Sequence, residues 1–180
     1  MVMTEAGEGY SRCEMLPGSM EGVTASKCAI KAGCTIRPKL YENKAAALFI
    51  FKGTGSIKAG EKTFEIKERC LFCPNFANEA YEITADTDME YLELLQEMTE
   101  EDWKHFEMYH IVLPWFNTFS NWHLYTEGFR GDELKSYAIL HQYYVSRMSL
   151  GEVVGPGEAK LEPHKHPELY QWFYGLPGTD

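Results

Sequence analysis

Residues 46–66, AALFIFKGTGSIKAGEKTFEI, carry the pattern that decides the fold. The stretch opens with apolar residues typical of strands, turns at Gly53-Thr54-Gly55 and at Ala59-Gly60-Glu61-Lys62, and closes on Thr63-Phe64-Glu65-Ile66, which alternates with period two. Three further short segments of strand character follow: Cys70 to Pro74, Ala80 to Ile83 and Glu90 to Leu95. Many short strands separated by turns predict an all-β protein, built as a sandwich or a closed barrel.

The composition changes after this region. Thr99-Glu100-Glu101-Asp102 has the form of a helix N-cap with an acidic third position, and apolar residues follow near helical spacing, so a helix is expected from about Glu100 to His110. An aromatic loop is expected next, ending near Gly128 and packing over a domain or dimer interface. Its aromatic residues are Trp115, Phe116, Phe119, Trp122 and Tyr125. From Tyr137 onward the residues again favour strands.

Charge and length exclude several classes of protein. The 180 residues allow one domain or two small ones, and a net charge of −10 with pI near 5.1 argues against binding to nucleic acid or to anionic membranes. The longest apolar run, residues 45–51, is far shorter than a membrane span. The five cysteines are an odd number and the N-terminus has no signal pattern, so we expect reduced thiols and a cytoplasmic location.

An internal repeat emerges when the chain is shifted over itself by 125 positions. Residues 36–41 then fall on residues 161–166, with Pro38 on Pro163, and Gly53 falls on Gly178. The apolar residues 48–51 fall on residues 173–176. The hydrophobic pattern and the turn residues agree although few residues are identical, which is typical of a duplicated unit.

The second copy of this repeat resembles the first motif of the cupin family. His164-Lys165-His166, followed by Gln171 and Gly178, matches Gly-x5-His-x-His-x(3,4)-Glu-x6-Gly, with Gln171 in place of the usual Glu. The first copy keeps the spacing through residues 39–41, Ala46 and Gly53, but has no ligand residues. Residues 74–79 are similar to the second cupin motif, with Glu79 at the histidine position.

The resemblance implies a bicupin, with cupin-type jelly-roll barrels and a short helical, aromatic-rich linker. We expect residues 26–98 to form an N-terminal barrel without the usual metal ligands and residues 99–136 to form the linker. Residues 137–180 would be the first half of a C-terminal unit that carries the metal motif.

A metal site is predicted at His164, His166 and Gln171. Residues two apart on a strand face the same side, so both imidazoles would point into the barrel. Glu168 competes for the third position, but Gln171 keeps the family spacing to Gly178. Two imidazoles and one oxygen donor suit Fe(II), Zn(II), Ni(II), Mn(II) or Cu(II) and leave positions open for substrate.

The first unit carries polar residues where ligands would otherwise stand. Arg37, Lys39 and Tyr41 share a strand face and, with Glu79, could line a polar pocket for an anion or a sugar. A cluster of satisfied ion pairs filling the emptied barrel is the alternative that we favour.

The length is short for two complete units. Under the same shift, the counterparts of residues 56–96 would begin just past Asp180. We favour a fragment of a bicupin of about 220 to 240 residues. Alternatively, strands from Met1 to Ala25 or from a second protomer complete the second sheet, or residues 137–180 add strands to a single barrel.

The resemblance implies a metal-dependent enzyme acting on a small polar metabolite, carboxylate-like or carbohydrate-like, through Lewis-acid or dioxygen chemistry. Family members include dioxygenases, isomerases, cyclases, lyases and aminohydrolases. The alternatives are a non-catalytic ligand-binding or sensor cupin and a structural cupin that forms oligomers. We expect a small-molecule ligand and a homodimer.

Overall fold

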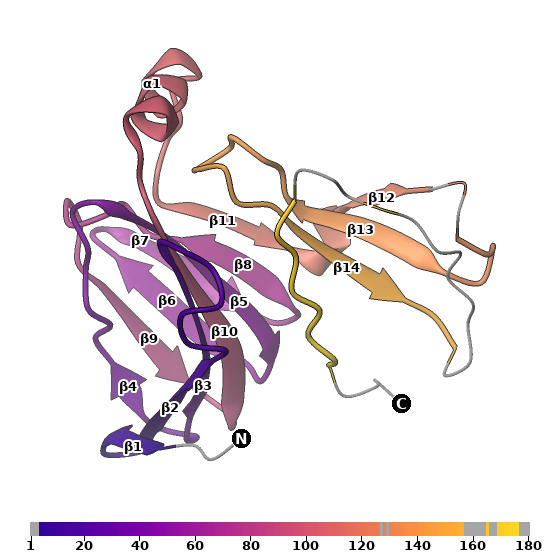
Figure 1. Cartoon of the computed structure of the whole chain (residues 1–180). Helices are drawn as coiled ribbons and strands as arrows, with labels where there is room; N and C mark the ends of the chain where they lie inside the picture. Colours follow the sequence, from indigo (N-terminus) through magenta and orange to yellow (C-terminus); the bar gives the residue numbers. More distant parts are fainter. Residues whose placement is uncertain (1–3, 127, 129, 157–164, 166–168, 177–180) are drawn as a thin grey trace.

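Two antiparallel sheets face each other in the first two thirds of the chain (Figure 1). The structure is a computed structural model and describes residues 4–126, 128, 130–156, 165 and 169–176. The larger sheet, sheet A, has seven strands in the spatial order β1 (Thr4–Gly7), β2 (Tyr10–Met15), β3 (Val23–Ile30), β10 (Met89–Glu97), β5 (Lys44–Lys52), β8 (Cys70–Cys73) and β11 (Trp115–Thr118). The smaller sheet, sheet B, has the order β4 (Thr35–Ile36), β9 (Tyr81–Ala85), β6 (Gly55–Ala59) and β7 (Lys62–Ile66).

The strands predicted between residues 46 and 95 are confirmed, and so are the turns between them. Gly53 shows why the first turn needs glycine. Its φ is +96°, and a Cβ there would lie 2.7 Å from the backbone oxygen of Asp88. In the described residues no strand pairing joins sheet A to sheet B, so of the two predicted arrangements, a sandwich or a closed barrel, the structure has the sandwich, an open jelly roll.

The main core lies between the two sheets. Side chains from both sheets meet there and are almost fully buried, among them Ile30, Leu48, Ile57, Phe72 and Tyr91. The alternating burial of β6 and β9 reflects this arrangement, because one face of sheet B meets the core and the other faces solvent.

A second core covers the opposite face of sheet A. Phe49 and Leu71 reach it from β5 and β8, and Trp122, Ile139 and Val145 close over them. The central strands β5 and β8 are therefore buried on both faces, which explains why residues 45–50 and 70–73 are continuously apolar instead of alternating. The strands themselves were predicted from the sequence, but their burial on both faces was not.

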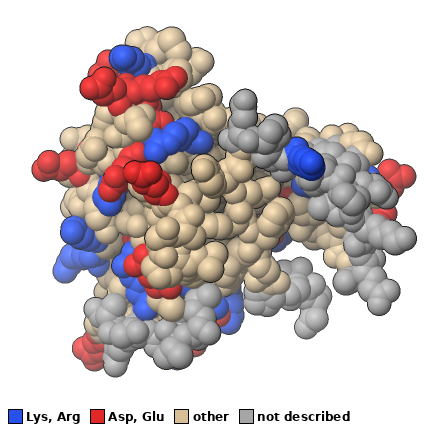
Figure 2. All heavy atoms as spheres, viewed as in Figure 1, with Lys and Arg blue, Asp and Glu red and all other residues tan. Residues whose placement is uncertain are grey.

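The predicted helix is confirmed as α1, Glu100–Met108. The Thr99 side chain accepts a hydrogen bond from the Asp102 backbone, and the Asp102 carboxylate accepts one from the Thr99 N–H at 2.8 Å, which completes a capping box. Figure 2 shows acidic side chains gathered around this helix, whose first turn carries Glu100, Glu101 and Asp102. Their negative charges stabilise the helix N-terminus.

The aromatic segment after the helix was expected to be a loop, and this expectation is wrong for most of it. Trp115–Thr118 forms β11 and pairs with β8, a short 3₁₀ helix covers Phe119–Asn121, and His123–Tyr125 forms β12. The reason is that its aromatic side chains alternate between the two cores. Phe116 packs on Phe64 of the main core at 5.2 Å between ring centroids, while Trp115 faces the second core.

The strands β12, β13 (Lys135–Leu140) and β14 (Leu150–Val154) form a separate antiparallel sheet beside the jelly roll (Figure 1). Residues 169–176 were expected to favour strand structure but lie outside strands. Tyr174 instead packs on Phe51 of sheet A, with 6.1 Å between ring centroids. The strands β1 and β2 extend sheet A and do not complete a second unit. Among the described residues, no helix has the length and apolar character to cross a membrane.

Candidate functional site

Three neighbouring strands of sheet A turn polar side chains toward the interior of the jelly roll. On β10, the inward positions are Met89, Tyr91, Glu93 and Leu95, so Glu93 is the single charged residue in an otherwise buried row. Glu93 pairs in register with Ser26 of β3, two residues before the core residue Cys28. Arg12 of β2 pairs in register with Cys28. The side chains of Arg12, Ser26 and Glu93 therefore share the inward face.

Arg12 and Glu93 form an ion pair inside this cluster. Two guanidinium nitrogens of Arg12, Nη2 at 2.7 Å and Nε at 3.2 Å, donate to the same oxygen, Oε2 of Glu93. The Glu93 side chain is only 8% exposed, whereas that of Arg12 is 34% exposed. The pair thus reaches from the interior to the solvent, and its carboxylate is desolvated while its guanidinium remains accessible.

Ser26 is a buried polar group without a partner. Its hydroxyl is fully enclosed, and the described residues offer it no hydrogen bond. A hydroxyl left in this state costs free energy, so it is an unusual feature of a folded core. Because Ser26 lies beside Glu93, this part of the interior is polar and its groups have hydrogen-bonding capacity that the described residues do not use.

A tyrosine network adjoins the ion pair. Tyr91 donates to the Tyr10 hydroxyl, and Tyr10 donates to Sγ of Cys28, both at 3.4 Å. Burial raises the pKa of Tyr10, Cys28 and Tyr91 above their ordinary values, and the negative charge of Glu93 adds to each of these shifts. The network is therefore neutral at physiological pH and presents hydroxyl and thiol groups, not anions.

Two of the pocket residues predicted from the first unit lie together. Lys39 places its ammonium 5.3 Å from the centre of the Tyr41 ring. Tyr41 packs against the main core, and its pKa is raised first by burial and then by the charge of Glu93.

The other two predicted residues lie elsewhere. Arg37 forms an exposed ion pair with Glu82 at 2.6 Å, and its side chain is 79% exposed. Glu79 lies beside Gly60, at the turn between β6 and β7. Sequence reasoning missed Arg12, Ser26 and Glu93. A signal for Glu93 existed, because it is the one charge among the alternate positions 89, 91, 93 and 95 of an apolar strand.

Comparisons with known proteins bear on the fold. No protein-family model and no curated protein matches the sequence. A glyoxylate-induced protein from Pseudomonas aeruginosa superimposes with a TM-score of 0.58 at 10% identity, over 78% of this chain and 53% of its own. KdgF from Halomonas sp. gives 0.47 at 11% identity, over 56% of this chain and 92% of its own. The cupin domain of Schizosaccharomyces pombe Cnp3 gives 0.47 at 15% identity, over 58% and 74%.

This chain has a jelly-roll fold of two facing antiparallel sheets, and it shares this fold with the glyoxylate-induced protein. At these identities the comparisons establish the fold alone, because one cupin scaffold supports many different activities. The arrangement of the bicupin remains a prediction. In the part of the chain that the structure describes, the strands after Trp122 are β12, β13 and β14, which form one three-stranded sheet.

The predicted metal ligands are mostly beyond the part described. His164, His166 and Glu168 lie outside the described residues, and Gln171 is exposed and outside any strand. Within the described ranges, no three His, Cys, Asp or Glu side chains approach one another as a metal site requires.

The interior of the jelly roll does not fit a divalent cation. Of the residues that the structure describes, Glu93 is the buried carboxylate on this face, and it already neutralises Arg12. The nearby Cys28 thiol and tyrosine hydroxyls have raised pKa values and so remain protonated. Divalent metals need deprotonated ligands, which this set of donors does not supply.

Proposed function

We propose that the chain is a small-molecule-binding cupin protein whose ligand enters the jelly roll beside Arg12 and Glu93. The ion pair that joins a buried carboxylate to an accessible guanidinium is the observation that carries the proposal. The unpartnered Ser26 hydroxyl and the neutral tyrosines supply further hydrogen-bonding groups at the same place. Apolar side chains at these positions would stabilise the core as well as the Arg12–Glu93 ion pair does. The polar groups are therefore better explained by a role in recognising a ligand.

The chemistry of the cluster selects a class of ligand. Both guanidinium contacts to Glu93 go to Oε2, and the described residues give Oε1 no hydrogen bond. A ligand hydroxyl can donate to that oxygen, while a ligand carboxylate can accept from the exposed side of Arg12. A small hydroxycarboxylate satisfies both groups at once. A simple cation is disfavoured because Arg12 repels it.

The test is a binding screen with a matched control. Glycolate, gluconate and glucuronate are titrated into the protein and followed by calorimetry and by thermal unfolding. We expect at least one of the three to bind, and we expect Glu93→Gln to weaken that binding about tenfold, the loss typical of one charge-assisted hydrogen bond. Glu82→Gln is the control, because it makes the same chemical change in an exposed ion pair of sheet B. Failure of all three probes to bind, or equal loss in both variants, would contradict the proposal.

A metal-dependent enzyme centred on His164, His166 and Gln171 is a second proposal. It is supported by the spacing of these residues in the sequence, which resembles the first cupin motif. A metal held there would supply Lewis-acid chemistry at an oxygen-bearing substrate. Elemental analysis of the purified protein tests it: we expect stoichiometric transition metal in the wild type and its loss in the combined variant His164→Ala and His166→Ala. Metal that persists in the variant, or no metal in the wild type, would refute this proposal.

A further inference from the structure

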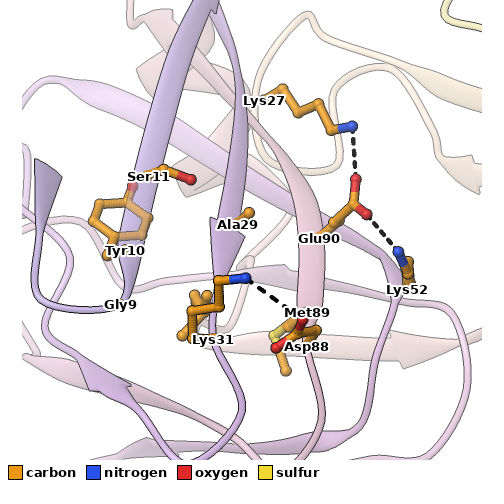
Figure 3. Close-up of a pocket in the computed structure, with 11 residues that line it drawn as sticks. Gly9, Tyr10, Ser11, Lys27, Ala29, Lys31, Lys52, Asp88, Met89 and Glu90 are labelled. Atoms are coloured by element: carbon orange, nitrogen blue, oxygen red, sulfur yellow. Dashed lines mark hydrogen bonds and ion pairs between the residues drawn. The ribbon is translucent and has the colours of Figure 1, made fainter. Parts of the chain in front are cut away.

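A groove on the outer face of sheet A lies on the opposite side of the sheet from Arg12 and Glu93. It encloses about 500 Å³, a volume suited to a small metabolite. Figure 3 shows Lys27 of β3, Lys31 just after the end of that strand, and Lys52 at the end of β5 around this groove. Asp88 and Glu90 line the same hollow at the start of β10.

The floor of the groove is made of small residues. Ser11 of β2 and Ala29 of β3 are paired in register, and Gly9 extends the same surface. Lys27 lies two residues before Ala29 on β3, and Lys31 follows just past the end of the strand, so both line the groove near this floor. The Ser11 hydroxyl points toward the groove in Figure 3, and the described residues give it no hydrogen bond.

The ion pairs in the groove leave positive charge in excess. Glu90 bridges Lys27 at 2.6 Å and Lys52 at 2.7 Å, so one carboxylate serves two ammonium groups. Lys31 lies 3.8 Å from Asp88, and both side chains are mostly exposed. One Asp88 oxygen also accepts the Ala32 N–H at 3.0 Å. Three lysines therefore face two carboxylates, on a protein whose net charge is −10.

We propose that this groove binds a small phosphomonoester, with its phosphate above Ala29 between Lys31, Lys27 and the Ser11 hydroxyl. The cationic side chains are lysines without any arginine, and ammonium groups act as point charges that suit the spread charge of a phosphate. A phosphomonoester carries about −1.5 to −2 charges at pH 7, more than a carboxylate, so it is the better match for a surplus of lysines. The groove is a separate site from the interior cluster, which lies across the sheet.

Calorimetric titration at low ionic strength tests this site, with inorganic phosphate and glycerol 3-phosphate as probes. We expect glycerol 3-phosphate to bind and Lys31→Gln to weaken its binding about tenfold. Lys58→Gln removes the same charge from an exposed position in sheet B, and we expect it to leave the affinity within about twofold of the wild type.

Glu90→Gln gives the sharpest contrast. It frees Lys27 and Lys52 from their shared carboxylate, so phosphate affinity rises if the groove binds anions, whereas a purely structural ion-pair network shows only a loss of stability. The proposal would be overturned if neither probe bound, or if Lys31→Gln and Lys58→Gln had equal effects on the affinity. Glu93→Gln should leave phosphate binding unchanged, so failure of this site is distinguishable from failure of the interior site.

Discussion

Removing either partner of the Arg12–Glu93 pair should destabilise the fold, and to different extents. Breaking a buried ion pair costs about 3 to 5 kcal/mol, because one charge remains uncompensated. Arg12→Met leaves the Glu93 side chain, 8% exposed, unpaired, so we expect a loss in this full range. Glu93→Leu leaves Arg12, 34% exposed, which water can still solvate, so we expect a smaller loss of about 2 kcal/mol.

Combining the two substitutions separates stability from recognition. Arg12→Met with Glu93→Leu removes both charges and replaces them with apolar groups, so the free energy of unfolding should return to within about 1 kcal/mol of the wild type. The double variant should nevertheless have lost the hydroxycarboxylate binding proposed for the interior.

Urea unfolding followed by the fluorescence of the four tryptophans measures the free energy of unfolding for all four proteins of this cycle. Single-variant costs that simply add in the double variant would refute the idea that the two charges depend on each other. A larger cost for Glu93→Leu than for Arg12→Met would refute the stated asymmetry of burial.

Three further predictions concern the fold. Trp122→Ala should lower the free energy of unfolding by about 3 to 5 kcal/mol, since the ring is 6% exposed and packs on Phe49. The control Leu124→Ala should change the free energy of unfolding little, because that side chain is 53% exposed, and urea unfolding measures both variants. Burial opposes ionisation of Asp102, but hydrogen bonds from Thr99 and the charge of Arg147 outweigh this effect and lower the pKa of the carboxyl below 3.8. The stability that this carboxylate contributes is therefore present above about pH 4 and is lost as the pH falls further. In acid unfolding, Asp102→Asn should lack this part of the loss. Burial raises the pKa of the Cys70 thiol to about 12. A thiol reagent at pH 8 should therefore modify only the partly exposed Cys13 and Cys34 until the protein unfolds. Rapid modification of more than two thiols in the native state would contradict the described burial.

The strands between residues 46 and 95 were predictable because local signals agree. Glycine turns at 53–55 and 59–62 separate segments of clear strand propensity, and the capping box at Thr99 and Asp102 marks the helix start. These signals act over a few residues, so they can be read without knowing the tertiary structure.

Other features depend on contacts between distant segments. The strand β2 has a partly exposed sequence with several polar residues, and its place in sheet A follows from its pairing with β3. The strand β1 pairs in turn with β2. Trp115–Thr118 forms a strand that no local signal predicts, because its partner β8 lies some forty residues earlier in the chain. The burial of β5 on both faces requires the second core, which residues 119–145 supply.

The candidate site was predictable only in part for the same reason. The resemblance to the cupin motif indicated Lys39 and Tyr41, and in the structure Tyr41 packs against the main core with the Lys39 ammonium over its ring. Arg12 and Ser26 carry no motif, and only the register of β2, β3 and β10 brings them beside Glu93. Sequence spacing within one segment cannot reveal a site assembled from three strands.

The most direct test of the central claim is a map of ligand-induced chemical-shift changes by NMR. Glycolate, gluconate and glucuronate are titrated into ¹⁵N-labelled protein, and the backbone amides and the Arg12 Nε–H are followed. We expect shift changes from one or more of these ligands to concentrate at residues 10–12, 26–28, 41 and 91–93 and to disappear in the Arg12→Met, Glu93→Leu double variant. Shift changes confined to other parts of the chain, or persisting in that double variant, would contradict a binding site inside the jelly roll.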